Sequence, residues 1–205
     1  MKRLIWTGMV CGLLVLAVLQ NVEAGKYNPT RSLGDPFAGF ENLPSVSGQA
    51  VSLSDFDKAD VLVIVTTCNS CPYAVEYEQR FQEFHQKYAD NPRVQFIAIN
   101  CNLVKDDSLE EMKQHAEKAG LTFPYLFDES QETGKDLGAL RTPECFVLNR
   151  ERKIIYMGAF DDSTDASQVK QQYVQEAVNA TLKGEAVEIA ETPPIGCLIR
   201  YKRRR

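Results

Sequence analysis

The sequence predicts one α/β domain with a central mixed sheet, helices on both faces of that sheet and a β-hairpin extension at the N-terminus. Apolar runs of strand length alternate with helical patterns between residues 61 and 182. The first run, residues 61–65, is a continuous aliphatic segment that suits a strand buried on both faces. The chain has 205 residues, which is sufficient for a single core, so its six cysteines are not needed to staple the fold.

The first 24 residues have the pattern of a signal peptide. Lys2 and Arg3 give a basic start, residues 4–19 are apolar, and small residues precede a cleavage site after Ala24. We therefore expect an exported protein, periplasmic or secreted, and an uncleaved membrane anchor is the alternative, although the run is short for a bilayer span. Cleavage removes Cys11 and leaves five cysteines where disulfides persist, so at least one thiol should lack a partner.

The charge of the chain excludes a domain-wide basic surface. The formal net charge is −5, and loss of Lys2, Arg3 and Glu23 changes it to −6, so nucleic acid is not an expected partner. Residues 200–205 nevertheless contain five basic side chains. We expect a solvated tail there, and the alternative is weak electrostatic contact with an anionic membrane or envelope surface.

The elements of the N-terminal part are short. Residues 25–39 have no apolar period and are predicted to be a linker or an extended arm. Two extended pieces, residues 40–43 and 50–53, are predicted to form the hairpin around a turn at Ser47 and Gly48. The buried strand at 61–65 follows.

The next elements have clear boundary signals. Pro72 suits the first turn of a helix whose aromatic residues recur at helical spacing until Asn91-Pro92, and residues 94–99 form a second apolar strand. Ser108 is predicted to cap another helix, which ends at Gly120. A short helix is predicted over residues 131–137.

The last elements complete the alternation. Residues 145–148 and 153–157 are predicted to be two strands of a hairpin, and residues 165–182 a closing helix with one apolar side. The domain is therefore assigned to residues 40–185, followed by a C-terminal arm with a basic tail over residues 186–205.

Cys68 and Cys71 form a Cys-Asn-Ser-Cys motif between the buried strand and the next helix. A helix N-terminus favours a thiolate, so one cysteine becomes nucleophilic near neutral pH while the other can close a disulfide with it. We expect Cys68, as the more exposed, to attack and Cys71 to resolve the mixed disulfide. The alternatives are a zinc half-site, which has only His85 and His115 to complete it, and a purely structural disulfide. We expect neither a metal nor a cofactor.

With this motif in place, the chain resembles the thioredoxin superfamily and, within it, the redoxin branch near the alkyl hydroperoxide reductase and thiol-specific antioxidant family. The resemblance covers about residues 33–200 and is to a peroxiredoxin-like subgroup that carries a CxxC. It rests on residues 61–66, 68–73, 96–100, 123–128, 142–148, 158–163 and 194–197. It implies the thioredoxin fold and a cis-proline loop in which Thr142 and Pro143 contact the substrate beside the dithiol. By itself, a Thr-Pro pair indicates only a turn.

Departures from the family pattern affect the expected chemistry. Cys71 and the following proline match the peroxidatic loop of peroxiredoxins, but Cys68 stands where those proteins have a threonine and Ile64 where they have a proline. Arg141 is only loosely placed for the arginine that polarises a peroxide, so efficient peroxidase activity is in doubt. Leu62 stands in place of the buried aspartate of thioredoxins, so Cys71 must lose its proton to water or to another group.

The remaining cysteines have different settings. Cys101 and Cys145 lie at the ends of predicted strands and are expected to be small buried side chains. Cys197 follows Pro193 and Pro194 on a stiff arm. If this arm folds back onto the domain, Cys197 is a candidate additional resolving thiol.

Together these features predict an exported thiol-disulfide oxidoreductase whose partners are protein or small-molecule disulfides and an unidentified electron donor. The alternative enzyme is a peroxiredoxin-like peroxidase in which Cys71 is peroxidatic and Cys68 resolves. A third interpretation is a non-catalytic binding module with the same fold.

Overall fold

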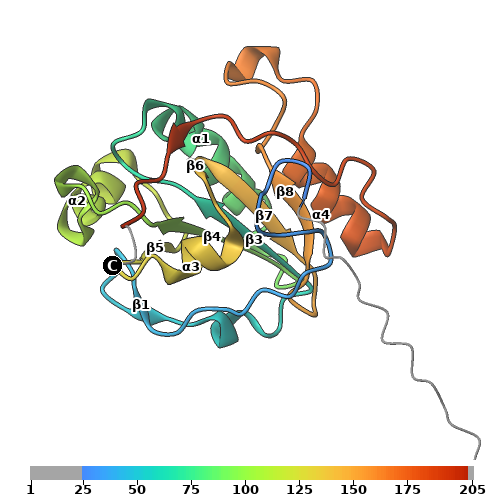
Figure 1. Ribbon diagram of the computed structural model, residues 1–205, viewed down its shortest axis with the longest axis horizontal. Coiled ribbons are helices and arrows are strands. Elements are labelled where there is room, and N and C mark those ends of the chain that lie inside the picture. Colours follow the sequence, from blue (N-terminus) through green and yellow to red (C-terminus); the bar gives the residue numbers. More distant parts are fainter. Residues whose placement is uncertain (1–24, 203–205) are drawn as a thin grey trace, which may run out of the picture.

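The central sheet of the computed structural model, which describes residues 25–202, has five strands in the order β5-β4-β3-β7-β8 (Figure 1). The strands are β3 (Val61–Thr66), β4 (Val94–Asn100), β5 (Tyr125–Phe127), β7 (Glu144–Leu148) and β8 (Ile154–Gly158). β3, β4 and β5 are parallel, whereas β7 and β8 run antiparallel to their neighbours, so the sheet is mixed as predicted. The predicted signal peptide and residues 203–205 lie outside the described residues.

The middle strand β3 is buried along its whole length, as its aliphatic run predicts. Alternate side chains point to opposite faces of a strand. Val61, Val63 and Val65 accordingly belong to the core on one face, and Leu62 and Ile64 to the core on the other.

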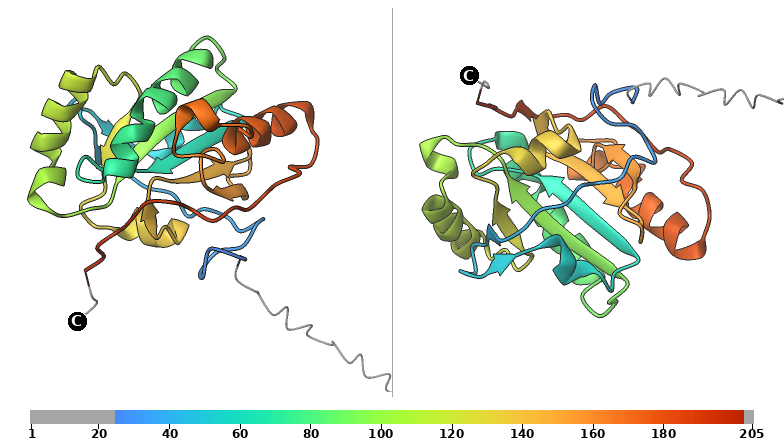
Figure 2. Two further views of the ribbon diagram at one scale, coloured as in Figure 1. Left: turned by 90° about the horizontal axis from the view of Figure 1, so that it is seen from above. Right: turned by 60° about the horizontal axis from the view of Figure 1, so that its bottom comes forward.

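Helices cover both faces of the sheet (Figure 2, left). The helices are α1 (Pro72–Lys87), α2 (Leu109–Ala119), α3 (Glu132–Leu137) and α4 (Tyr173–Lys183). α1, α2 and α4 supply the apolar side chains of one core, for example Phe81, Met112 and Val178. The opposite core contains Leu137 of α3 together with Phe37 and other residues of the N-terminal segment.

The predicted start of α1 and both predicted boundaries of α2 are confirmed, whereas α1 ends at Lys87, before the predicted stop at Asn91-Pro92. α1 begins at Pro72, directly after Cys71. The Ser108 side chain accepts a hydrogen bond from the Glu111 N–H, and Gly120 ends α2 in the left-handed conformation with φ of 67°. Ser108 therefore satisfies a helical N–H that would otherwise have no partner.

The prediction was wrong about the start of the last helix. Instead of beginning at residue 165, α4 begins at Tyr173. The Asp165 side chain accepts from the Ser167 N–H and caps a separate 3-10 turn (Ala166–Gln168), and Asp162 accepts from the Lys170 N–H. These local bonds to the backbone compete with helix formation and hold the segment as a loop.

The two ends of the described chain lie against the domain. The N-terminal hairpin, β1 (Leu43–Pro44) with β2 (Ala50–Val51), is shorter than predicted, because the chain enters a 3-10 turn (Leu53–Phe56). At the other end, β9 (Cys197–Leu198) pairs with β6 (Arg141–Thr142). Among residues 25–202, no helix is both long and apolar enough to cross a membrane.

Candidate active site

The Cys68 to Cys71 turn lies at the carboxyl end of the central strand. β3 ends at Thr66, and Cys71 is the N-cap residue of α1. The N–H groups at this end of the helix have no partner within the helix and favour negative charge. The structure therefore places both cysteines where the sequence predicted a thiolate to be stabilised.

The two residues between the cysteines are held by the turn that follows β4. Asp107, fully buried, accepts from the Ser70 N–H at 2.9 Å and from the Ser70 hydroxyl at 2.6 Å. The Asn69 amide donates to the backbone oxygen of Asp106 at 3.0 Å and accepts from the Tyr125 hydroxyl at 3.0 Å. These contacts fix the spacing of the two sulfurs.

Sequence reasoning did not identify Asp107 as a site residue. A signal was present, because Asp107 follows β4, which runs parallel to β3. The carboxyl ends of parallel strands meet at one edge of a sheet, and ligand and active-site groups gather there. A buried carboxylate at this edge is therefore a natural support for the dithiol turn.

The Thr142–Pro143 peptide is cis, as the resemblance implied. Two buried side chains hold this loop. The Thr66 hydroxyl lies 3.0 Å from the Arg141 carbonyl oxygen and 3.2 Å from that of Glu144. A carboxylate oxygen of Glu144 accepts from the N–H groups of Leu140 and Arg141.

The loop touches both cysteines. The Cys71 sulfur lies 2.9 Å from the Thr142 carbonyl oxygen, and the Cys68 sulfur lies 3.4 Å from the Thr142 hydroxyl oxygen. The structure thus brings together Cys68, Cys71 and Thr142, with Pro143 next to them in the chain. All four were predicted to form one site.

Exposure does not distinguish the two cysteines. Cys68 and Cys71 are each 1% exposed. Cys68 was expected to attack because it would be the more exposed of the two, and the structure shows no such difference. Cys197 of the C-terminal arm packs against the cluster that the two form with Ala74. All three cysteines line a cavity of about 710 Å³, together with residues of the 102–106 segment and the 198–200 segment.

The two thiols titrate as a pair, because each acts on the other. Their hydrogen bond lowers the pKa of Cys71 and raises the pKa of Cys68. Bonds from Cys197, Thr142 and the Ala74 N–H also lower the pKa of Cys71, against the opposing effect of burial. For Cys68, burial and the charge of Asp107 add to the increase. Of the two thiols, Cys71 therefore has the lowered pKa and Cys68 the raised one.

The other two buried cysteines behave as predicted from the sequence. Cys101 and Cys145 are both fully buried, and burial raises the pKa of each thiol well above its usual value. A thiol that stays protonated is a poor nucleophile. These residues act as small core side chains.

Arg141 does not point to an open peroxide site. Its guanidinium donates to the carbonyl oxygen of Gly196 at 2.7 Å, so it is bound to the C-terminal arm. Within residues 25–202, no group of three or more histidine, cysteine, aspartate or glutamate side chains is arranged to hold a metal ion.

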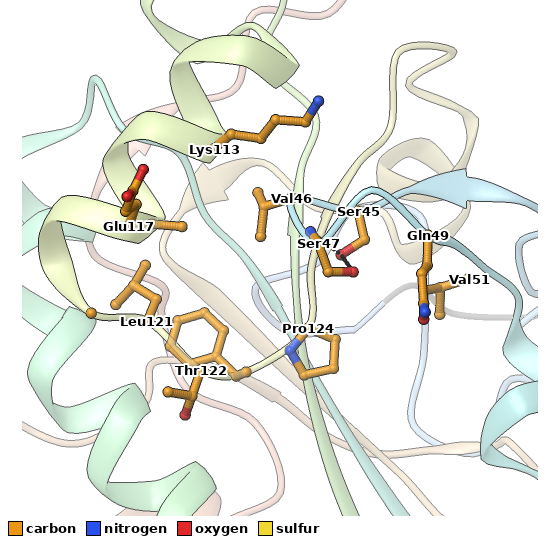
Figure 3. Close-up of a pocket in the computed structure, with 13 residues that line it drawn as sticks. Ser45, Val46, Ser47, Gln49, Val51, Lys113, Glu117, Leu121, Thr122 and Pro124 are labelled. Carbon is orange, nitrogen blue, oxygen red and sulfur yellow. Dashed lines mark hydrogen bonds between the residues drawn. The ribbon is translucent and has the colours of Figure 1, made fainter.

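A second hollow, of about 640 Å³, lies away from the dithiol (Figure 3). One side of this hollow is formed by α2 and the loop that follows it, which carry Lys113, Glu117 and Leu121. The other side is formed by the β1–β2 turn, which carries Ser45 and Ser47. The described residues that line it include neither cysteine nor histidine. The candidate site is therefore the first cavity, which Cys68, Cys71 and Cys197 line.

A family model described as Redoxin matches residues 25–173. None of the curated proteins matches the chain. A hypothetical protein from Sinorhizobium meliloti is 32% identical, with 84% of this chain and 96% of that chain covered and a TM-score of 0.78. An uncharacterized conserved protein from Geobacillus kaustophilus is 34% identical, with 85% and 94% covered and a TM-score of 0.78.

A more distant structure, Peroxidoxin BcpB from Mycobacterium tuberculosis, shares the fold. It is 22% identical, with 74% of this chain and 96% of that chain covered and a TM-score of 0.56. The family match and these similarities confirm the predicted thioredoxin-like α/β fold and its redoxin branch.

Proposed function

The chain belongs to the Redoxin family, and we propose that it is an exported thiol-disulfide oxidoreductase that works through Cys68 and Cys71. One observation carries the proposal: both sulfurs lie at the start of α1 and contact Thr142 of the cis-proline loop, at 3.4 Å and 2.9 Å. A nucleophile and a resolving thiol are thus held within reach of one another. The loop beside them has backbone groups with which an extended substrate can pair.

The electrostatics of the pair support Cys71 as the attacking thiol, which reverses the order expected from the sequence. The Cys71 thiolate attacks one sulfur of a substrate disulfide, and the other substrate sulfur leaves as a thiolate. Cys68 then loses its proton to solvent, attacks Cys71 and releases the second substrate thiol. Two electrons pass to the substrate, and the Cys68–Cys71 disulfide that remains is reduced by a thiol donor.

Export is part of the proposal and rests on the sequence of residues 1–24. The Glu191 carboxylate accepts from the N–H groups of Lys26 and Asn28, so the residues after the predicted cleavage site belong to the folded domain. N-terminal sequencing of protein recovered outside the cytoplasm should begin at Gly25. A chain that keeps Met1 and stays in the cytoplasm would contradict export.

The activity is tested by the reduction of insulin disulfides with dithiothreitol as electron donor. The wild-type chain should accelerate the reaction, Cys71→Ser should reduce it to the uncatalysed rate, and Cys68→Ser should lower it. Cys145→Ala is the matched control, since it removes a thiol that burial keeps protonated, and it should retain activity. If both serine variants keep the wild-type rate, the chain is a binding module and the proposal fails.

A peroxidase is the second candidate, and the lowered pKa of Cys71 is the observation that favours it. Against it stands Arg141, whose guanidinium is bound to Gly196. Peroxide consumption that Cys71→Ser abolishes, together with a sulfenic acid trapped at Cys71 in Cys68→Ser, would establish this activity. Without both results, disulfide exchange remains the function.

A further inference from the structure

The C-terminal arm crosses the molecule after α4 (Figure 1) and contains the short strand β9. β9 pairs antiparallel with β6, with Leu198 opposite Arg141 and Cys197 opposite Thr142. The Ile199 N–H donates to the Leu140 carbonyl oxygen at 2.9 Å and continues the pairing. The edge of the cis-proline loop is therefore already occupied by part of the same chain.

The register of this pairing directs one side chain at the dithiol. Thr142, whose carbonyl and hydroxyl oxygens touch Cys71 and Cys68, is the residue paired with Cys197. Cys197 packs against the cluster of Cys68, Cys71 and Ala74, and it lines the same cavity. A cysteine thus lies where the reactive sulfur of a paired substrate strand would lie.

The close approach of β9 depends on glycine. A Cβ atom at Gly196 would lie 2.1 Å from the Thr142 carbonyl oxygen, far inside van der Waals contact. The Gly196 carbonyl oxygen also accepts from the Arg141 guanidinium at 2.7 Å. Gly196 can therefore approach the loop closely because it has no side chain, and its hydrogen bond with the charged Arg141 holds it there.

Contacts beyond the strand hold the arm in this position. The Gln131 side chain donates to the Arg200 carbonyl oxygen at 3.0 Å and accepts from the Lys202 N–H at 2.8 Å. The Tyr201 hydroxyl donates to the Ala139 carbonyl oxygen at 2.9 Å. The arm is thus fixed on the C-terminal side of Cys197 by residues near α3.

We propose that β9 is a built-in substrate strand and that Cys197 takes the disulfide from the oxidised dithiol, forming a Cys71–Cys197 bond. This rests on the proposed function, because it begins with the Cys68–Cys71 disulfide. The Cys197 thiolate attacks the Cys71 sulfur, the Cys71–Cys197 bond forms and the Cys68–Cys71 bond breaks. The electron pair leaves on Cys68, which takes a proton from solvent, while the Cys197 proton goes to solvent. No external oxidant or reductant is consumed.

The charges around Cys197 suit an exchange that follows oxidation of the dithiol. In the reduced protein, the hydrogen bond with Cys71, burial and the charge of Cys71 raise the pKa of Cys197 to about 11. A Cys68–Cys71 disulfide removes that charge, and Arg141, which acts in the opposite direction, remains. The thiolate of Cys197 is therefore easier to form in the state in which it has a disulfide to attack.

The exchange returns Cys68 to the thiol form and keeps the disulfide within the chain. An external protein disulfide must displace β9 before it can pair with Thr142. The preferred external substrate is accordingly an extended segment whose cysteine follows a glycine, as Cys197 follows Gly196.

Peptide mapping of the oxidised chain tests the proposal. Trypsin leaves Cys68 and Cys71 together in residues 59–80 and Cys197 in residues 184–200, so a cross-link between these two peptides identifies the new bond. The wild-type chain is reduced, oxidised with glutathione disulfide, blocked with an alkylating reagent and digested. We expect the cross-linked peptide in the wild-type chain.

The cysteine variants assign the bond. Cys68→Ser should accumulate the cross-link, because Cys71 then has only Cys197 to pair with, and Cys71→Ser, the matched control, should lack it. A Cys197 that is alkylated in every oxidised sample, beside an internal disulfide in residues 59–80, would overturn the inference and leave the proposed function intact. A cross-link that is equally abundant in Cys71→Ser would overturn the assignment to Cys71. Failure of the proposed function is recognised separately, because the wild-type chain would then not accelerate the reduction of insulin disulfides.

Discussion

Asp107 shows how a single buried carboxylate acts on the dithiol without touching either sulfur through a hydrogen bond. It holds Ser70 through two bonds and raises the pKa of Cys68 through its charge. The negative charge beside Cys68 therefore widens the difference between the pKa values of the two thiols. The division of roles between the two cysteines thus depends on a residue outside the motif.

Asp107→Asn should lower the pKa of Cys68, because it removes the nearby negative charge while an amide oxygen can still accept from Ser70. The measurement is thiolate ultraviolet absorbance against pH in a chain that also carries Cys71→Ser, so that Cys68 titrates without its partner. Asp106→Asn is the control, since its exposed side chain leaves the bond from Asn69 to the Asp106 backbone unchanged. Identical titrations for the two variants would contradict the role of Asp107.

Glu144 is 2% exposed, and burial raises the pKa of its carboxyl group to about 7. A carboxyl group whose pKa is higher in the folded state contributes stability below its unfolded pKa, and this contribution is lost as pH rises through the folded pKa. The loss should therefore occur between about pH 4.5 and pH 7. Above that range the buried carboxylate opposes folding.

Glu144→Gln should remove this loss, because the amide is neutral and its oxygen can still accept from Leu140 and Arg141. The free energy of unfolding of the variant relative to wild type should rise between pH 5 and pH 8 by up to about 3 kcal/mol. Urea unfolding at the two pH values measures it. Exposed Glu185→Gln is the control for the change of net charge. If the free energies of unfolding of wild type and Glu144→Gln depend on pH in the same way, ionisation of the buried Glu144 carboxyl group does not destabilise the fold.

At the scale of elements, the sequence predicted the helices and strands whose signals lie within the element itself or at its ends. β3 followed from its aliphatic run, and α2 from Ser108 and Gly120 at its ends. The start of α4 was missed, because Asp165 can cap a short turn as well as a long helix. β9 had no local signal, since its partner β6 lies far back in the sequence and the pairing depends on the whole domain.

Gly196→Ala tests the fit of β9 at the element scale. The added Cβ would clash with the Thr142 carbonyl oxygen, so the strand should be displaced and the dithiol uncovered. The rate at which iodoacetamide alkylates residues 59–80 in the reduced protein should increase. Ile195→Ala changes an exposed side chain on the same arm and should leave the rate unchanged. Equal rates for the two variants would mean that β9 does not cover the dithiol.

At the scale of the molecule, the sequence predicted the fold class, and the resemblance to the thioredoxin superfamily implied the meeting of Cys68, Cys71 and Thr142, which the structure shows at the ends of adjacent strands. It did not predict that both cysteines are buried or that the C-terminal arm packs against them. It also left the position of Cys197 open. These features depend on contacts between segments that are far apart in the sequence, so local sequence patterns do not predict them.

In the proposed function, the task of the dithiol is the reversible exchange of two electrons with thiols and disulfides. The sheet edge fixes the turn between the cysteines, the cis-proline loop touches both sulfurs, and the arm covers them. The direction of transfer follows from the reduction potential.

The most direct test is therefore the redox equilibrium of Cys68 and Cys71 with glutathione. The wild-type chain is equilibrated at a series of ratios of reduced to oxidised glutathione, blocked with an alkylating reagent and analysed by the mass of residues 59–80. We expect one transition in which Cys71 becomes protected from the reagent in the more oxidising mixtures, through a disulfide either with Cys68 or with Cys197, and Cys71→Ser should abolish both bonds. Two thiols that remain alkylated at every ratio would contradict it.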